Sequence, residues 1–195
     1  MVQHGERADA RLNRERLLTA AAGEFAAHGL NAEIKEIAER AGLSVGAVYR
    51  HFPSKDDLVA AVLDQVLGEF DRVLDAAAAV EDGDAAVRCF IAGGVGVAER
   101  FGGMLTALLE GGGLKPFRAA SAERRAALNE RLTALIARGV ASGRLRRDLD
   151  PRVGAAVLES LLAPWLVAGL RDALSAEQVV EALSNLYLHG AAAGR

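Results

Sequence analysis

The chain has 195 residues, enough for one domain or two small ones, and its 51% hydrophobic content can fill a substantial core. Four prolines and few aromatic residues (5%), together with abundant alanine and leucine, favour helices over sheets, so we predict an all-α fold. The formal net charge of −3 argues mildly against a general nucleic-acid binder.

The first ten residues are predicted to form a mobile arm. Arg7, together with Arg11 and Arg14 at the start of the next helix, could lie along phosphate or reach a minor groove, and a solvated tail is the equal alternative. A helix is predicted over residues 12–28, and Gly29 is expected to end it.

Two short helices joined by a tight turn are predicted between residues 33 and 51. Residues 34–41 place apolar side chains at i, i+3, i+4 and i+7; Gly42 can adopt the left-handed conformation that ends a helix, and Ser44 can cap the next one. The second helix is expected to bury Val45, Val48 and Phe52 and to turn small and polar residues outward. Such a pair is typical of a helix-turn-helix, whose second helix enters a DNA major groove.

A further helix is predicted to begin after Pro53, with Ser54 and Asp57 forming a capping box. Lys55 lies in its first turn, where a cation opposes the helix dipole. A DNA phosphate at this helix N-terminus would offset that unfavourable interaction.

At this point the sequence resembles the TetR family of bacterial transcriptional regulators over about residues 10 to 60. The resemblance implies an all-α homodimer with a three-helix DNA-binding domain at residues 1–53 and a larger helical ligand-binding and dimerisation domain at residues 54–195, about nine helices in total. It also implies a regulator, expected to be a repressor, that a small effector releases from its operator. The residues that carry it are Ile37, Ala38, Ala41, Gly42, Leu43, Ser44, Gly46, Tyr49, His51, Phe52, Lys55 and Leu58.

The expected DNA contacts divide into two groups. Tyr49, His51 and Lys55 are expected to hold phosphates, the role of His51 being implied by the resemblance, and Lys35 could reach either phosphate or base. Residues 1–60 hold eight Lys or Arg and nine Asp or Glu, so binding depends on local placement of charge. Base edges are expected to meet Ser44, Val45, Gly46, Ala47 and Arg50.

A long helix is predicted from residue 54 to about residue 80, and another from residue 85 to about residue 100. The second of these is apolar all round in its middle, which indicates burial. Glycine clusters at 93–96, 102–103 and 111–113 are predicted to mark bends, close packing or hinges, because each glycine weakens a helix interior by about 1 kcal/mol.

The C-terminal part is predicted to contain helices at residues 121–141, 151–171 and from 176 onward. Asp150 with Pro151, and Ser175 with Gln178, are helix-start signals. The last two helices have wide apolar faces, which predicts a four-helix dimer interface and a near-palindromic operator. Its predicted residues are Val157, Leu161, Val180, Leu183 and Leu186.

The helical C-terminal domain is also predicted to hold a mainly apolar pocket for a small effector, without a cofactor or metal. The four histidines are scattered, with no cysteine or carboxylate at metal-ligand spacing. The candidate pocket residues are Phe90, Phe101, Met104, Leu108, Glu110, Phe117, Trp165 and Tyr187.

Two other functions remain open at this point. Gly42-Leu43-Ser44-Val45-Gly46 matches the Gly-x-Ser-x-Gly pattern of serine hydrolases, but it lacks the preceding strand that such a nucleophile requires, so we do not expect an enzyme. A helical interaction module without DNA binding is the other alternative. The single cysteine, Cys89, and the lack of an apolar leader or long apolar run indicate a cytoplasmic protein without a membrane segment.

Overall fold

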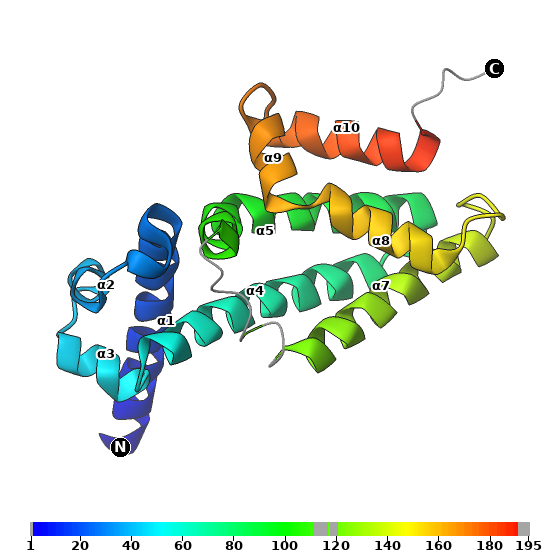
Figure 1. Cartoon of the computed structure of the whole chain (residues 1–195). Helices are drawn as coiled ribbons and strands as arrows, with labels where there is room; N and C mark the ends of the chain where they lie inside the picture. Colours follow the sequence, from blue (N-terminus) through cyan, green and yellow to red (C-terminus); the bar gives the residue numbers. More distant parts are fainter. Residues whose placement is uncertain (1, 111–116, 118–120, 191–195) are drawn as a thin grey trace. The chain divides into compact units, whose positions relative to one another are not determined.

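The structure is a computed structural model that describes residues 2–110, 117 and 121–190 (Figure 1). Every regular element in these ranges is a helix, nine of them α-helices, which confirms the all-α prediction. The helices are α1 (Val2–His28), the 3-10 turn η1 (Gly29–Asn31), α2 (Ile34–Ala41), α3 (Val45–His51), α4 (Lys55–Ala78), α5 (Gly83–Glu110), α7 (Ala122–Ala141), α8 (Pro151–Leu161), α9 (Pro164–Arg171) and α10 (Ala176–His189).

The chain divides into two compact units. The first contains the residues up to Val66 and the end of α5 from Gly103, and the second contains residues 67–102 and the helices from α7 onward. The long helices α4 and α5 each contribute to both units, so the unit boundary cuts through two helices rather than falling in a loop. The predicted domain boundary between residues 53 and 54 remains a prediction.

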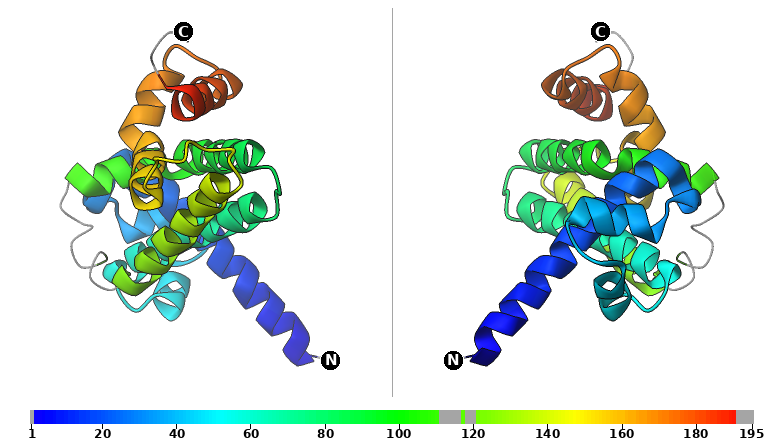
Figure 2. Two further views of the ribbon diagram at one scale, coloured as in Figure 1. Left: turned by 90° about the vertical axis from the view of Figure 1, so that its right-hand side faces the viewer. Right: turned by 90° about the vertical axis from the view of Figure 1, so that its left-hand side faces the viewer.

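The first unit is built on α1. Its second half buries Leu17 and Phe25 completely. The end of α5 also packs in this unit, since a Cβ placed on Gly29, whose φ is +55°, would lie 3.4 Å from the carbonyl oxygen of Ala107. The predicted arm at residues 1–10 is wrong: α1 begins at Val2, and Figure 2 shows its N-terminal turns extending away from α2 and α3. Continuing an existing helix by a few residues avoids a second nucleation step.

The second unit has α5 in its core. Phe90, Ile91 and Val95 are buried against apolar side chains of α4, α7, α8 and α10. The predicted end of this helix near residue 100 is wrong, because α5 continues through its glycines to Glu110. Gly93 serves close packing, one of the three predicted roles, since a Cβ there would lie 2.7 Å from both methyl groups of Val73. The third glycine cluster, at 111–113, lies outside the described residues.

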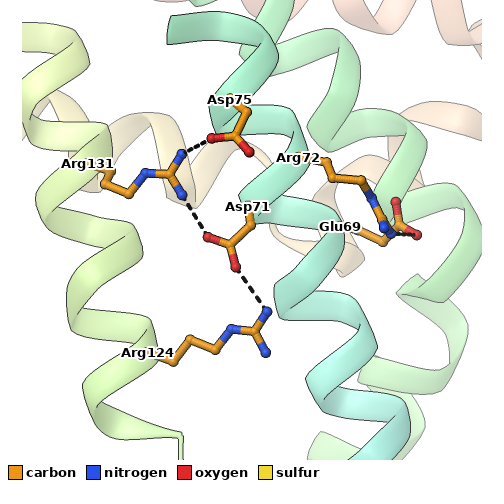
Figure 3. Close-up of polar contacts among 6 residues, drawn as sticks. All are labelled: Glu69, Asp71, Arg72, Asp75, Arg124 and Arg131. Atoms are coloured by element: carbon orange, nitrogen blue, oxygen red, sulfur yellow. Dashed lines mark hydrogen bonds and ion pairs between the residues drawn. The ribbon is translucent and has the colours of Figure 1, made fainter.

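Three arginines at seven-residue intervals join α7 to α4, and Figure 3 shows the first two of them, Arg124 and Arg131. Arg124 and Arg131 both bind the Asp71 carboxylate, at 2.9 and 2.7 Å, and Arg131 also reaches Asp75 at 2.5 Å. Arg138 donates to the carbonyl oxygens of residues 78 and 80, each at 2.9 Å, which pairs a cation with the C-terminal end of α4. The face of α7 that meets α4 is therefore charged.

A second ion-pair group on α4 centres on Glu69, whose side chain is mostly buried. Arg72 and Arg100 both bind its carboxylate, Arg100 at 2.8 Å. Burial raises the pKa of Glu69, but the hydrogen bonds from Arg100 and Arg72 outweigh it, so the pKa of this carboxyl lies below its usual value. The carboxylate stays ionised and links α4 to α5.

The predicted helix over residues 151–171 is two helices, α8 and α9, bent by 50°. Pro164 causes the break, because proline lacks an amide donor and forces the preceding residue out of the helical conformation; Ala163 accordingly has φ −56° and ψ 132°. The predicted caps are confirmed: the Asp150 carboxylate accepts from the amide of Arg152 at 2.8 Å, and Ser175 forms a capping box at the start of α10.

Two further features concern the C-terminal helices. Tyr187 of α10 donates to the carbonyl oxygen of Gly154 in α8 at 3.0 Å, and burial raises the pKa of this phenol to about 12. In the part of the chain that the structure describes, no single helix is long and apolar enough to cross a membrane, and α8 with α9 meets that test only as a bent pair.

Candidate nucleic-acid interface

The turn between α2 and α3 has the geometry that the sequence predicts. Gly42 adopts a left-handed conformation with φ 66° and ψ 38°, and the amide of Leu43 donates to the carbonyl oxygen of Ala38 at 2.9 Å. Ser44 then caps α3, its hydroxyl accepting from the amide of Ala47 at 3.2 Å. The cap of α2 is Glu33, whose amide donates to the carboxylate of Glu36 at 3.4 Å. Local hydrogen bonds thus stabilise the helix-turn-helix at the start of each of its two helices.

The outer face of α3 is exposed and carries short side chains around two long polar ones. Tyr49 is 50% exposed, and Arg50 is exposed as well. A Cβ on Gly46 would meet no atom nearer than Ser44 Oγ at 4.0 Å, so packing does not require this glycine. Val45 was expected to be buried but is 39% exposed and belongs to this face. The low profile of the face lets the α3 backbone approach another surface closely.

The inner face of α3 holds the helix in the first unit. Val48 and Phe52 are buried, at 1% and 3% exposure, and Ala47 and His51 are half-buried. Ser44 is exposed at the start of the helix. Of the residues predicted to meet base edges, all but Ala47 are therefore exposed.

The two predicted lysine contacts already have protein partners. Lys35 lies 3.8 Å from the carboxylate of Glu39, one turn along α2. Lys55 donates from Nζ to the carbonyl oxygen of Leu30 at 2.5 Å, which joins the start of α4 to the η1 turn. An ammonium group has three donors, so this bond leaves two for another acceptor. The phosphate role of Lys55 remains a prediction, and its structural role is the one the sequence did not reveal.

Two acidic side chains of α1 pair with basic side chains of the first unit. Glu24 binds Arg40 at 2.7 Å and links α1 to α2, and Glu15 lies 3.7 Å from Arg11. Ligand atoms of Glu24, His28 and Glu36 lie within 4.8 Å of one another, a spacing that could hold a metal ion. The Arg40 guanidinium already supplies positive charge to Glu24, so the cluster is also satisfied as an ion pair.

The predicted effector residues belong to both units. Phe90 and Phe101 are buried in the second unit, whereas Met104 and Leu108 are buried in the first. Trp165 is 68% exposed. The side chain of Glu110 lies outside the described part of the chain. Phe117 is half-buried and Tyr187 bonds to Gly154.

An open depression of about 530 Å³ lies in the second unit, between α7 and the start of α8. It contains none of the eight predicted effector residues, and half of its lining is charged. The lining residues are Thr133, Ala137, Arg147, Asp148, Leu149, Asp150, Pro151 and Arg152.

Several apolar side chains of the C-terminal helices are exposed. Val157 and Leu186, both predicted to lie in a dimer interface, are 47% and 44% exposed. Val153, one turn before Val157, is 56% exposed. Leu161 and Val180 are half-buried, and Leu183 is buried at 4% in the core of the second unit. A period of 3.6 residues does not by itself distinguish the apolar face of a helix that packs in the core from the apolar face that stays exposed.

Comparison with known proteins decides the family. Residues 17–62 match the family model described as bacterial regulatory proteins, tetR family, and this segment runs from the buried half of α1 into α4.

The helix-turn-helix segment, residues 17–62, is that of a TetR-family protein.

Individual relatives agree with this assignment. The HTH-type transcriptional repressor KstR2 of Mycolicibacterium smegmatis is 41% identical over 69 residues, a match that spans 33% of this chain and 34% of that protein. The crystal structure of the TetR-family regulator PfmR from Thermus thermophilus superposes with a TM-score of 0.75 at 28% identity, covering 90% of this chain and 98% of that one. The fold similarity therefore extends well beyond the helix-turn-helix, and it removes the support for a serine hydrolase at Ser44.

Two further structures share the fold at lower identity. AibR in complex with isovaleryl coenzyme A and operator DNA has a TM-score of 0.73 at 18% identity, covering 90% of this chain and 98% of that one. FadR from Bacillus subtilis in complex with stearoyl-CoA has a TM-score of 0.74 at 15% identity, with 91% and 99% coverage.

Proposed function

We propose that this TetR-family regulator is a repressor that binds a near-palindromic operator as a homodimer and is released by a small effector with an apolar chain. In this proposal residues 1–53 read DNA and residues 54–195 bind the effector and form the dimer. The observation that carries the proposal is the outer face of α3, where exposed Tyr49 and Arg50 flank a backbone kept accessible by Gly46.

The proposed contacts follow from the chemistry of that face. Arg50 is the side chain suited to a guanine, through paired hydrogen bonds to O6 and N7. Val45 offers an apolar contact, for instance to a thymine methyl group. Tyr49 and His51 are assigned to phosphates, which set the position of the helix without reading sequence. Lys55 would share its ammonium group between the carbonyl oxygen of Leu30 and a phosphate.

Dimerisation is proposed through the C-terminal helices. Val153 and Val157 lie one turn apart on α8, and Trp165 and Leu186 add exposed apolar surface from α9 and α10. Exposed apolar side chains in this number favour a covered surface. A two-fold dimer would set two α3 helices about 34–36 Å apart, or a multiple of it, to match successive turns of DNA.

An acyl-coenzyme A is the proposed class of effector. Its support is the fold shared with AibR and FadR, whose structures contain isovaleryl coenzyme A and stearoyl-CoA, together with the apolar interior of the second unit. In the proposed mechanism the effector stabilises a conformation in which the two recognition helices no longer fit successive grooves, with α4 carrying the change.

Fluorescence anisotropy of a labelled operator duplex tests both the DNA-binding part and the effector part of the proposal. Arg50→Ala is expected to weaken operator binding by about 1–3 kcal/mol, since a paired contact to a base is lost. Arg125→Ala, which removes an exposed charge from α7, serves as the matched control and is expected to bind as the wild type does. Full operator affinity in Arg50→Ala would contradict the contact assignment.

The effector is tested in the same assay with isovaleryl-CoA and stearoyl-CoA. We expect at least one of them to weaken operator binding by roughly 10-fold or more, which corresponds to a coupling free energy of about 1.4 kcal/mol. Free coenzyme A is the control and should have no such effect. Operator affinity unchanged by acyl chains of every length would contradict the effector class and leave the DNA-binding part standing.

A further inference from the structure

Two arginines of α1 lie at opposite ends of the recognition helix. The guanidinium carbon of Arg14 lies over the ring of Phe52, 5.2 Å from its centroid, and Phe52 is the residue that follows α3. Arg16 approaches the turn before α3, where a Cβ on Gly42 would lie 2.8 Å from Arg16 Nη2. Both arginines are exposed. They therefore bracket α3, one at each end.

The helical geometry of α1 explains this placement. Residues two apart on an α-helix project about 200° apart around its axis. Leu17 and Leu18, which follow directly, are buried and anchor this part of α1 in the first unit. The side chain of Arg14 can then pass on one side of α1 to reach Phe52, and that of Arg16 on the other side to reach the turn at Gly42.

Neither arginine is neutralised by a carboxylate. The nearby acid Glu15 lies between them in sequence but pairs with Arg11 at 3.7 Å. Arg40 and Lys35 pair with Glu24 and Glu39. Within the described ranges, Arg14 and Arg16 make no hydrogen bond or ion pair, so their donors are free for an external anion.

The stacked position of Arg14 favours such a role. A guanidinium over an aromatic face gains a cation–π interaction and keeps its donors at the ring edge available. Because Phe52 is buried and fixed, Arg14 is held in place before any ligand arrives. Less side-chain entropy is then lost on binding.

We propose that Arg14 and Arg16 bind DNA phosphates on the two sides of the groove that α3 enters. A helix of seven residues is about 10 Å long, comparable with the roughly 12 Å width of the major groove, so groups at its two ends can face the two bordering backbones. The part of α1 around Arg14 and Arg16 thereby belongs to the DNA interface. This inference rests on the proposed DNA-binding function and assigns residues to it that lie outside the helix-turn-helix.

The test measures operator affinity against salt concentration for wild type, Arg14→Ala and Arg16→Ala. A lost phosphate contact lowers the log–log slope by about 0.9, so a dimer that loses one in each subunit changes by about 1.8. The ratio of variant to wild-type Kd is then expected to fall about 12-fold between 50 and 200 mM salt. The same change is expected on a scrambled duplex, because phosphates carry no sequence information.

The control variants separate charge contact from a folding effect. Arg125→Ala in α7 removes one exposed charge per subunit and should leave the slope unchanged. Arg14→Lys and Arg16→Lys should restore most of the slope. A lower melting temperature with an unchanged slope in both alanine variants would mean that the arginines only support α3, and it would overturn the inference. Failure of the wild type to bind any duplex would instead overturn the proposed function.

Discussion

The packing of α5 gives a sharp prediction, because two of its glycines three residues apart have opposite surroundings. A Cβ on Gly93 would lie 2.7 Å from both methyl groups of Val73 and 3.2 Å from its Cβ, whereas a Cβ on Gly96 would meet nothing within 4 Å. Ordinary contact begins at 3.4 Å. Since Val73 is β-branched and presents all three carbons, rotation of its side chain does not relieve the clash.

The expected free energies follow from two terms. Replacing glycine by alanine inside a helix stabilises by about 0.5–1 kcal/mol, and this term is common to both positions. Overpacking at Gly93 costs about 1–3 kcal/mol, and only that position carries it. Gly96→Ala is therefore expected to stabilise the protein by up to about 1 kcal/mol, and Gly93→Ala to destabilise it by a similar amount.

Thermal unfolding followed by circular dichroism measures the difference. At about 2–4 °C per kcal/mol for a chain of this size, the two variants should differ in Tm by roughly 4–8 °C. Both are compared at one protein concentration, because the stability of the proposed dimer would depend on it. Equal melting temperatures, or a more stable Gly93→Ala, would refute the view that Gly93 is required by close packing against Val73.

Three further predictions concern polar contacts in the second unit. Tyr187→Phe removes the hydrogen bond to Gly154 and should lower the free energy of unfolding by about 1 kcal/mol in urea denaturation; no change would mean that this bond adds nothing. Asp71→Asn should lower the free energy of unfolding by up to about 1 kcal/mol, more than Asp75→Asn does, because Asp71 binds two arginines and is less exposed. The difference between the two variants should be smaller in 1 M salt. Hydrogen bonds from Arg152 hold the pKa of Asp150 at about 2, so the ionised carboxylate stabilises the folded protein above the ordinary pKa of 3.8, and this contribution is lost as the pH falls towards 2. Between these two pH values the free energy of unfolding of Asp150→Asn should therefore fall less than that of the wild type, and an equal fall would contradict this.

Helix starts and the helix-turn-helix were predictable because their signals are local. A capping box needs only residues i and i+3, as at Ser54 and Asp57, where the carboxylate accepts from the Ser54 amide at 3.0 Å and the hydroxyl accepts in return at 3.1 Å. The left-handed Gly42 is likewise set by its own backbone. The exposed face of α3 followed from helical periodicity, although Val45 was placed on the wrong side.

Features that depend on tertiary contact were not predictable in this way. The helix at α5 was predicted to end near residue 100, but it continues through its glycines to Glu110, because burial of Phe90, Ile91 and Val95 outweighs their low helix propensity. The contact between Lys55 and Leu30 joins residues 25 positions apart and leaves no pattern in the sequence.

The candidate interface shows the same limit. The sequence grouped Arg11 with Arg14 as basic residues near the start of α1. In the structure Arg11 pairs with Glu15, whereas Arg14 stacks on Phe52. Arg16, which approaches Gly42, was not singled out at all. Charge counts could not separate these cases, because pairing depends on which face of α1 each residue occupies.

The central claim, that α3 of a dimer reads DNA, is tested most directly by selecting bound duplexes from a random pool at two salt concentrations and sequencing them. A dimer that reads DNA through α3 is expected to select a near-palindromic motif whose half-sites lie about one helical turn apart, roughly 10 base pairs, or a multiple of it, with weaker recovery at the higher salt. No enriched motif at either salt would contradict it.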